Sequence, residues 1–418
     1  MKNVVIIGGG ASGLFSAILI KQNCPNCNVI VVERLERVGK KILATGNGRC
    51  NFSNKNVSSR KYNDKKFVDP FISRYDFDAI RDKFTELGLI TRIDSEGRAY
   101  PYSEVANSFL DVLRVNLKKY KIEERTNFEV TRILNIGTKD SPQYVVENTR
   151  RQTIDADYIV MATGGKASPV LGSNGSGYAL LKPWKVKITN TEPGLVGIKI
   201  DPSKIKGLSG VRVKCKAMIY DKKEKQNIWE EEGEVLFKED GLSGIVIMQM
   251  ATMIARNEIS KSHHHITTSL DLLPDYHEDD LLKLFQQRQS TMKNLEVSDF
   301  FVGVFPKILA LNVLRNAKID LSGYISDLTL NELIRIVHTV KLYEFEYKGM
   351  YGYDRAQVTV GGISLDEFKP GTLELAKAPN IYACGEIINV DGECGGYNMH
   401  WAFASGYQVA KEISERVE

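Results

Sequence analysis

The feature that most constrains this fold is a glycine-rich turn between a strand and a helix near the N-terminus. Residues 3–33 read NVVIIGGGASGLFSAILIKQNCPNCNVIVVE: a short apolar strand, the turn, an apolar helix (roughly 12–22) and a β-branched strand. Gly8, Gly10 and Gly13 have the GxGxxG spacing. Strand, turn, helix and strand in this order predict a β–α–β unit that binds a dinucleotide.

Each glycine of this turn has a physical reason. Gly8 permits the tight turn, Gly10 lets the backbone approach a pyrophosphate, and Gly13 lets the helix pack on the strand. The pyrophosphate is expected on the free N–H groups at the positive end of the helix dipole, near Ala11 and Ser12. The alternative is a glycine turn that serves packing alone.

The second strand of this unit ends on an acidic residue. Glu33 follows Gly13 by 20 positions and can accept hydrogen bonds from ribose hydroxyl groups. The unit by itself leaves open whether the dinucleotide is FAD or NAD.

Two later segments favour FAD. Residues 34–54, RLERVGKKILATGNGRCNFSN, form a loop rich in Gly, Asn and basic residues, where a purely NAD-binding fold would enter a crossover helix. Such a loop suits backbone donors that wrap an anionic, planar ligand, although it can also be a solvated surface loop. Residues 157–180 carry a buried strand that ends in Thr163-Gly164-Gly165, as in flavoproteins with two dinucleotide folds.

The stretch DGECGGYNMHWAFASG, residues 391–406, supplies the other half of the site. Tyr397 or Asn398 is expected to begin a helix whose N-terminus stabilises the negative charge of a reduced flavin. The pair Gly395-Gly396 is expected to keep side chains out of the path between the ring and the helix amides. Segments from both ends of the chain are therefore expected to build one cofactor site.

The dinucleotide pattern stops in the middle of the chain. An antiparallel β part is predicted at about 191–250 and a helical part at about 270–345. We therefore expect an α/β chain with a Rossmann-like FAD-binding domain in two pieces, 1–190 and 352–418. The insert, 191–351, is expected to be a substrate or cap domain.

Charge and hydropathy exclude several classes of protein. The net charge of +4 comes from 56 basic and 52 acidic residues, which alone does not indicate nucleic-acid binding. The longest apolar stretch, residues 244–255, is too short for a membrane span, and no secretory signal is visible. These features predict a cytoplasmic protein with no membrane segment.

Cysteine and histidine give no clear metal or disulfide signal. The six cysteines are irregularly spaced, which does not suggest a disulfide framework. Cys24 and Cys27 have redox-motif spacing but lie in a loop, and no second pair completes a zinc site. His263, His264 and His265 are consecutive, so they cannot all converge on one metal ion. No metal is predicted.

Basic residues recur in the predicted β part of the insert. They are read either as a solvated strand face or as a docking surface for a polyanion such as RNA. The residues are Lys199, Lys204, Lys206, Arg212, Lys214, Lys216, Lys222, Lys223 and Lys225.

These motifs together resemble the BaiN-type (YhiN-like) family of NAD(P)/FAD-dependent oxidoreductases. This family is a branch of the flavoproteins with two dinucleotide-binding domains, of glutathione-reductase (GR2-like) fold. The resemblance runs nearly end to end and rests on GGGASG (8–13), GKKILATGNGRCNFSN (39–54), GRAYPYS (97–103), ATGGKASPVLGSNGSGY (162–178), AQVTVGGIS (356–364) and GEIINVDGECGGYNMHWAFASGY (385–407). Three positions depart from the usual pattern, which has glycine at Asn47, aspartate at Asn389 and glutamine at His400.

The resemblance implies a non-covalent FAD that extends across both ends of the chain. It assigns the pyrophosphate to residues 8–13, the adenosine to Glu33, Arg34 and Val130, and the flavin to two further sets of residues. These sets are Lys41, Thr45, Gly46, Gly48, Arg49, Cys50 and Asn51, and Thr163, Gly164, Gly385, Glu386, Asp391, Gly396, Tyr397 and Asn398.

Hydride transfer from NAD(P)H through FAD to an activated C=C bond, or a similar small acceptor, is the expected reaction. No second GxGxxG unit follows residue 180, so NAD(P)H is expected to bind transiently at the flavin face. The resemblance also leaves open an rRNA uridine reductase, which would have an RNA substrate, and an amine-type oxidase that uses O₂. A flavin-binding protein without catalysis is the remaining alternative.

A proton donor is often needed beside a flavin. His400, Tyr397 and Cys50 are the catalytic candidates, with His400 favoured, and Cys394 and Tyr353 are further possibilities. Each of these side chains can instead serve packing or contact the ring.

Overall fold

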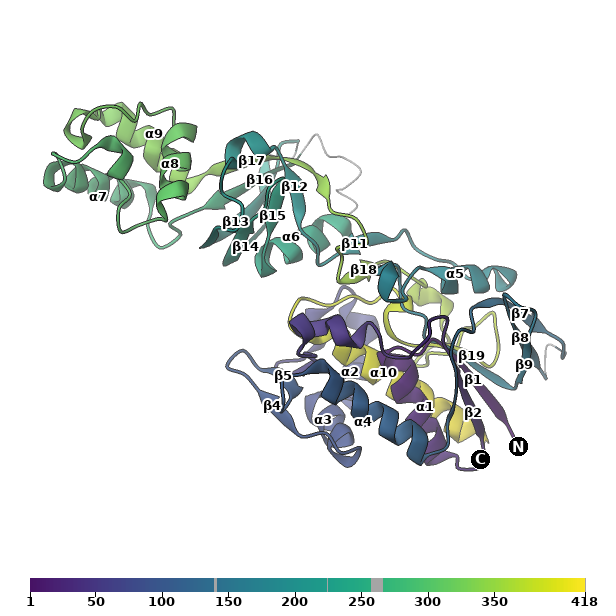
Figure 1. Cartoon of the computed structure of the whole chain (residues 1–418). Helices are drawn as coiled ribbons and strands as arrows, with labels where there is room; N and C mark the ends of the chain where they lie inside the picture. The colour runs from purple at the N-terminus through teal and green to yellow at the C-terminus, as the bar shows by residue number, and fades with distance from the viewer. Residues whose placement is uncertain (139–140, 224, 257–265, 418) are drawn as a thin grey trace. The chain divides into compact units, whose positions relative to one another are not determined.

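The computed structural model of the chain contains two compact units (Figure 1). The first unit combines Met1–Pro193 with Ala356–Glu418, and the second is Gly194–Arg355. The structure describes residues 1–138, 141–223, 225–256 and 266–417. The three consecutive histidines, 263–265, lie outside these described residues.

A five-stranded parallel sheet forms the centre of the first unit. Its order is β19-β10-β1-β2-β6, and Val4 of β1 lies between Val29 of β2 and Tyr158 of β10. Nearly continuous Val and Ile runs suit strands that are covered on both faces. The strands are β1 (Asn3–Ile7), β2 (Asn28–Val32), β6 (Glu123–Arg125), β10 (Tyr158–Met161) and β19 (Ile381–Ala383). The predicted α/β, Rossmann-like fold is confirmed.

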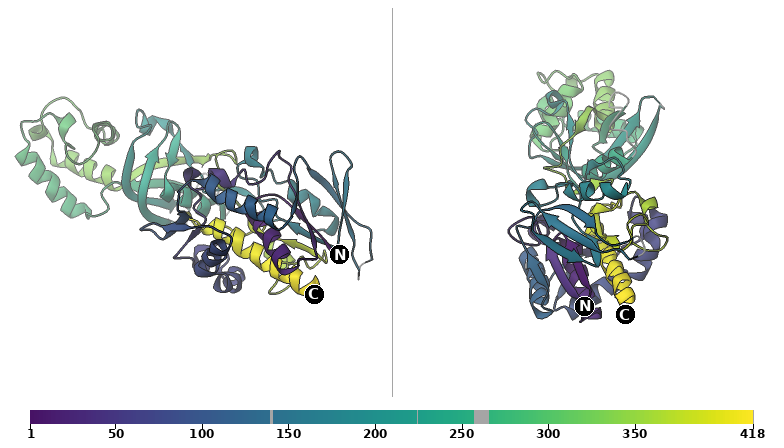
Figure 2. Two further views of the ribbon diagram at one scale, coloured as in Figure 1. Left: turned by 60° about the horizontal axis from the view of Figure 1, so that its bottom comes forward. Right: turned by 90° about the vertical axis from the view of Figure 1, so that its right-hand side faces the viewer.

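Two helices from opposite ends of the sequence pack against each other beside this sheet. They are α1 (Ala11–Asn23) and α10 (Tyr397–Val417), and α4 (Ala106–Lys119) also packs on α1. Figure 2 shows α10, in yellow, running beside α1, in purple, with the two chain ends close together. Residues Ser12–Ile20 of α1 are all buried, because the helix is apolar on every side and is covered on every side.

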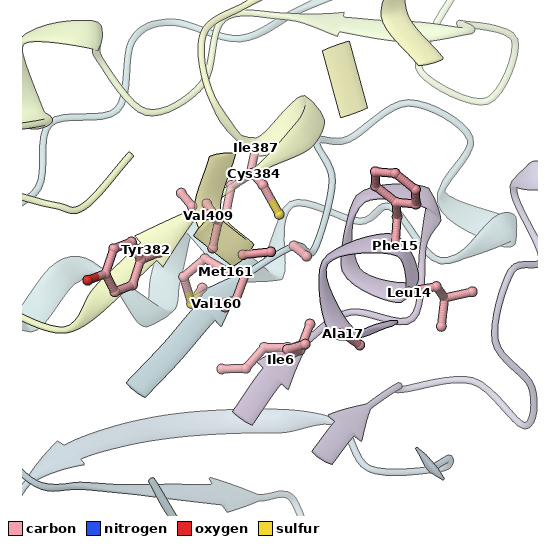
Figure 3. Packing of buried hydrophobic residues seen from close by; sticks show 14 of the residues in the cluster. Ile6, Leu14, Phe15, Ala17, Val160, Met161, Tyr382, Cys384, Ile387 and Val409 are labelled. Atoms are coloured by element: carbon pink, nitrogen blue, oxygen red, sulfur yellow. The ribbon is translucent and has the colours of Figure 1, made fainter. Parts of the chain in front are cut away.

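The core of the first unit joins this helix pair to the sheet (Figure 3). Ile6, Val160 and Tyr382 come from neighbouring strands, and Leu14 and Phe15 come from α1. All five side chains are fully buried. Burial of each such side chain stabilises the fold by about 1.5–3 kcal/mol.

Smaller elements complete the first unit around the central sheet. Asp64 and Asp76 cap two of its helices by accepting hydrogen bonds from Phe67 N and Ala79 N. The elements are η1 (Ile42–Gly48), β3 (Ser53–Asn54), α2 (Lys65–Arg74), α3 (Phe77–Glu86), β4 (Thr91–Ile93), β5 (Arg98–Pro101), β7 (Val130–Asn135), β8 (Tyr144–Asn148), β9 (Thr153–Ala156), α5 (Ser176–Leu180), β11 (Glu192–Gly194) and β18 (Val358–Val360).

The second unit contains a closed six-stranded barrel of order β12-β15-β14-β13-β16-β17. The helices α7, α8 and α9 are inserted between its last two strands. In the described part of the chain, every helix is too short or too polar to cross a membrane. The elements are β12 (Ile198–Ile200), β13 (Arg212–Asp221), β14 (Gln226–Phe237), β15 (Gly241–Ser243), α6 (Ile245–Arg256), β16 (Ile266–Asp271), α7 (Glu278–Thr291), α8 (Lys307–Asn316), α9 (Leu330–Lys341) and β17 (Tyr343–Met350).

Candidate functional site

The GxGxxG turn has two packed sides and one open side. A Cβ at Gly8 (φ +115°) would lie 2.3 Å from Ala162 O, and a Cβ at Gly13 would lie 2.1 Å from Gly8 O. A Cβ at Gly10 would meet no atom within 4 Å. Gly8 and Gly13 are therefore required by packing, while Gly10 keeps the start of α1 open to a ligand.

The N-terminus of α1 is an electrostatically uncompensated helix end. In the described chain, its first turn has no acidic side chain and Gly10 provides no side-chain cap. Ser12 instead faces the other end of the sequence, because its Oγ donates to Cys384 O at 3.4 Å. A Cβ at Gly385 would lie 2.6 Å from Ser12 Oγ, so the two ends of the chain meet closely here. The free amides suit an anion such as a pyrophosphate.

A pocket opens beside this turn, at the carboxyl ends of β1 and β2. Glu33 organises its edge, since Oε2 accepts from Gly9 N and Oε1 from Leu35 N, both at 2.9 Å. Burial raises the pKa of Glu33. Arg34 Nη1 is buried with no hydrogen-bond partner among the described residues. The lining residues are Ile7, Gly8, Val32, Glu33, Arg34, Phe128, Glu129, Val130, Thr163, Gly172, Ser176 and Leu180.

The loop after β2 has a run of left-handed backbone conformations. Gly46, Asn47, Gly48 and Cys50 have φ values of +56°, +55°, +81° and +57°. Asparagine tolerates this region better than other residues with a side chain, which explains how Asn47 replaces the glycine of the usual pattern. Thr45 Oγ1 donates to Ile42 O at 2.7 Å and so stabilises the loop internally.

The side chains of Arg49 and Cys50 in this loop are engaged within the protein. The Arg49 guanidinium lies 4.8 Å from the ring centroid of Tyr100 and 3.5 Å from Glu104, and the side chain is 45% exposed. Cys50 is fully buried, and burial raises the pKa of its thiol to about 12. A buried thiol with this pKa is a poor proton donor near neutral pH.

Asparagine side chains hold the turn before α10. Asn398 Oδ1 accepts from Gly392 N, and its Nδ2 donates to Gly392 O, both at 2.8 Å. Asn54 Nδ2 donates to Gly395 O at 2.9 Å, and Asn63 Oδ1 accepts from Asp391 N at 3.1 Å. Asn398 and the buried Asp391 therefore form part of the turn itself.

The glycine pair of this turn also has reasons in the backbone and in packing. Gly395 and Gly396 have φ values of +128° and +101°, which favour glycine. A Cβ at Gly396 would lie 2.6 Å from both Asn51 Oδ1 and Ser53 O. The glycine is therefore needed so that the start of α10 can pack on the segment 51–53. Asn51 Oδ1 is buried with no hydrogen-bond partner among the described residues.

His400 does not have the environment of a proton donor. Its ring is fully buried, with Nε2 2.9 Å from Tyr75 O and Nδ1 2.8 Å from Ser53 Oγ. A carbonyl only accepts, so Nε2 carries the proton and Nδ1 accepts from the hydroxyl. Burial lowers the pKa of His400 to about 4, which keeps the ring neutral. The geometry argues against the favoured catalytic role and makes His400 a link between β3 and the C-terminal end of α2.

Tyr397, the third catalytic candidate, lies at the first position of α10. Its backbone carbonyl accepts from Tyr62 Oη at 2.9 Å, and Lys61 Nζ lies 5.7 Å from its ring centroid. Burial raises the pKa of the Tyr397 phenol, so the phenol is protonated near neutral pH.

The two cysteines with redox-motif spacing are buried. Cys24 and Cys27 are buried free thiols, and burial raises the pKa of Cys27 to about 11, which disfavours the reactive thiolate. Within residues 1–138, 141–223, 225–256 and 266–417, no three His, Cys, Asp or Glu side chains are grouped so that they could hold a metal ion.

The fold and this site define a flavin-dependent oxidoreductase class, in which a Rossmann-like unit is assembled from both ends of the chain. The chain belongs to the family described as HI0933-like protein Rossmann domain, which matches residues 2–412. This result confirms the resemblance found in the motifs.

Individual relatives cover the whole chain. A protein of Clostridium scindens named 3-dehydro-bile acid delta(4,6)-reductase is 32% identical over 418 residues, which is 100% of both chains. The ribosomal RNA dihydrouridine synthase of Escherichia coli is 26% identical over 98% of each chain. The solved 3-ketosteroid delta1-dehydrogenase of Sterolibacterium denitrificans matches with a TM-score of 0.51 at 11% identity, covering 100% of both chains, and supports the fold.

Proposed function

We propose that this chain is an FAD-dependent reductase that passes hydride from NAD(P)H, through non-covalent FAD, to an activated C=C bond of a small molecule. The observation that carries the proposal is the meeting of the GxGxxG turn with the 384–398 segment at Ser12. This junction brings the start of α1 against the turn after β19, and the proposed FAD extends along both.

Three features of the site fit FAD. The side of Gly10 is open where a pyrophosphate has to approach the amides of α1. The pocket edged by Glu33 offers a carboxylate to ribose hydroxyls, and the buried Arg34 Nη1 offers a donor to the adenosine half. Asn51 Oδ1 offers an unsatisfied buried acceptor beside the start of α10. We propose that the predicted cofactor residues near α1 bind the adenosine and pyrophosphate, and that those near the start of α10 bind the flavin.

FAD, when bound, supplies the hydride chemistry, and the chain supplies positioning and charge. The start of α10 directs its positive dipole end toward the proposed flavin end, where it stabilises negative charge by up to about 2 kcal/mol. Tyr397 is the proposed proton donor, because it is the first residue of this helix and its side chain is less completely buried than those of His400 and Cys50. His400 and Cys50 are proposed to have structural roles, because both side chains are fully buried.

A steroid-like acceptor is the favoured substrate class. The relative from Clostridium scindens is named for reduction of a bile acid, and its likeness extends over all of both chains. Reduction of a C=C bond conjugated to a ketone requires a hydride at one carbon and a proton at the other. A flavin supplies the hydride and a nearby phenol supplies the proton.

An RNA substrate is less well supported, although one relative is named for it. In the barrel, Arg212 is ion-paired with Glu234, and Lys216 lies 3.7 Å from Glu230 and 3.9 Å from Glu232. The second unit contains 22 Lys and Arg residues against 23 Asp and Glu residues. A face whose basic side chains are neutralised by the neighbouring strand attracts a polyanion weakly.

The decisive experiment is anaerobic reduction of the purified protein. The visible spectrum should show bound flavin, NADH or NADPH should bleach it, and a conjugated 3-keto steroid should restore it faster than O₂ or a uridine-containing rRNA fragment does. Bleaching that is reversed only by O₂ would indicate an oxidase. A flavin that neither nicotinamide reduces would indicate a binding protein without this activity, and reoxidation by the RNA alone would establish the uridine reductase.

A further inference from the structure

Thr359, on β18, lies at the junction of the segments that form the proposed flavin site. Its side chain is buried, and its hydroxyl donates to Glu386 Oε1 at 2.8 Å. The same oxygen accepts from Lys166 N at 2.7 Å and from Ala167 N at 3.0 Å. A threonine hydroxyl has one donor and two acceptor sites, so this one is saturated.

The partner of Thr359, Glu386, accepts hydrogen bonds at both of its carboxylate oxygens. Glu386 Oε1 also accepts from Thr359 N at 2.9 Å, and Oε2 accepts from Lys41 Nζ at 2.8 Å. A Cβ at Gly165 would lie 2.3 Å from Thr359 Oγ1 and 2.9 Å from Glu386 Oε1. The glycine after the β10 strand is therefore required by this cluster.

The cluster joins four segments that are far apart in sequence. They are the loop after β2 at Lys41, the turn after β10 at residues 165–167, the strand β18, and the turn after β19 at Glu386. Two of these four segments, at Lys41 and Glu386, carry residues assigned to the flavin by the family resemblance, and the 165–167 turn directly follows the assigned residues Thr163 and Gly164. Lys41 and Glu386 are bound to each other, so neither offers its full charge to a ligand.

We propose that Thr359 is a positioning residue of the flavin site, which holds the Lys41–Glu386 ion pair and the 165–167 turn in the arrangement that FAD requires. This inference rests on the proposed function, because it assumes that these segments surround FAD. The Thr359 hydroxyl holds the Glu386 carboxylate, which in turn holds the Lys41 ammonium group. The same hydroxyl accepts from the Lys166 and Ala167 amides and so holds the 165–167 turn. The site is thereby preorganised, and less ordering is needed when the cofactor binds.

The matched pair Thr359→Val and Thr359→Ser tests the role of the hydroxyl. Valine has nearly the same shape but leaves the Lys166 and Ala167 amides without their acceptor and Glu386 Oε1 without one of its two donors, whereas serine keeps all three hydrogen bonds of the hydroxyl. We expect Thr359→Val to weaken FAD binding about tenfold or more, and Thr359→Ser to bind FAD within about twofold of the original chain. Flavin fluorescence titration of the flavin-stripped protein measures both constants, and far-UV circular dichroism checks that both variants are folded.

The ion pair gives a second test, which does not depend on Thr359→Val folding. Glu386→Gln leaves the Lys41 ammonium unneutralised, so it should raise the flavin midpoint potential; Lys41→Met leaves the carboxylate and should lower it. A merely structural effect would not give shifts of opposite sign. Lys119→Met, at the exposed end of α4, is the matched charge control and should leave the potential unchanged.

Each outcome has a definite meaning. Equal FAD affinity in the folded valine and serine variants, or shifts of the same sign in the two ion-pair variants, would overturn the role of Thr359 and its cluster. Failure of the original chain to bind FAD at all would instead refute the proposed function. Valine-specific loss of affinity together with opposite potential shifts would support the inference.

Discussion

Replacing Gly396 by alanine should separate packing from backbone strain at the start of α10. The new Cβ would lie 2.6 Å from Ser53 O, a backbone atom that cannot rotate away, on a backbone with φ +101°. Gly88 provides a matched control, because its φ is +102° and a Cβ there would meet no atom within 4 Å. The two substitutions therefore share the backbone cost and differ in the steric overlap.

The expected magnitude follows from these two contributions. A side chain on this kind of backbone costs about 1–3 kcal/mol, and both variants should lose that amount of unfolding free energy. Overlap with a rigid neighbour costs about 1–3 kcal/mol more, and only Gly396→Ala should show it. Each further kcal/mol lowers Tm by about 2–4 °C in a domain of this size.

Urea unfolding of the flavin-stripped protein measures the difference. Trp401 is a suitable probe because it is buried and lies one turn beyond Gly396, and the other two tryptophans, Trp184 and Trp229, can be replaced by phenylalanine. FAD affinity should also fall in Gly396→Ala and stay unchanged in Gly88→Ala. Equal unfolding free energies and equal FAD affinities in the two variants would refute the packing argument.

Three further predictions concern titratable side chains of the first unit. Burial lowers the pKa of His400 to about 4, so the unfolded chain binds a proton at this residue more readily than the folded chain does. The unfolding free energy should therefore fall by up to about 3 kcal/mol as the pH drops from 6.5 to 4. His400→Gln should flatten this part of a urea-midpoint profile, and an unchanged slope would contradict the assignment. Burial raises the pKa of Glu412 from 4.5 to about 7, so between these pH values the unfolded chain releases the proton more readily than the folded chain does. The unfolding free energy should therefore decrease as the pH rises from 4.5 to 7, and Glu412→Gln should remove this decrease. Glu33→Gln should weaken FAD binding, because it removes the charge offered to the ribose. It should also lower Tm, because the amide nitrogen cannot accept one of the two backbone hydrogen bonds that the carboxylate accepts from Gly9 N and Leu35 N; wild-type affinity in this variant would show that Glu33 does not bind the cofactor.

The local motifs of this chain were readable from sequence because each depends on neighbouring residues. The strand, glycine turn and helix of residues 3–33 follow from apolar runs and from the need for glycine at Gly8 and Gly13. The meeting of the two chain ends was also predicted, since both carry glycine turns that suit one cofactor.

Pairings between distant residues were not readable. Lys41 and Glu386 each look like a ligand residue alone, and their separation of 345 positions hides that they bind each other. His400 looked like an acid–base group because its neighbours in sequence do not reveal Ser53 and Tyr75, which bind both ring nitrogens. Arg49 likewise turns to Tyr100 and Glu104, which no local pattern indicates.

The division of the first unit into two sequence pieces has a consequence for the order of folding. The edge strand β19 and the helix α10 are synthesised after all of residues 194–355, so β10 must wait for its outer partner while a whole barrel is made. Contacts of such long range make this the slow step, and the exposed edge of β10 is the point where a nascent chain is most open to mispairing. The barrel, whose strands lie within one continuous segment, can finish folding first.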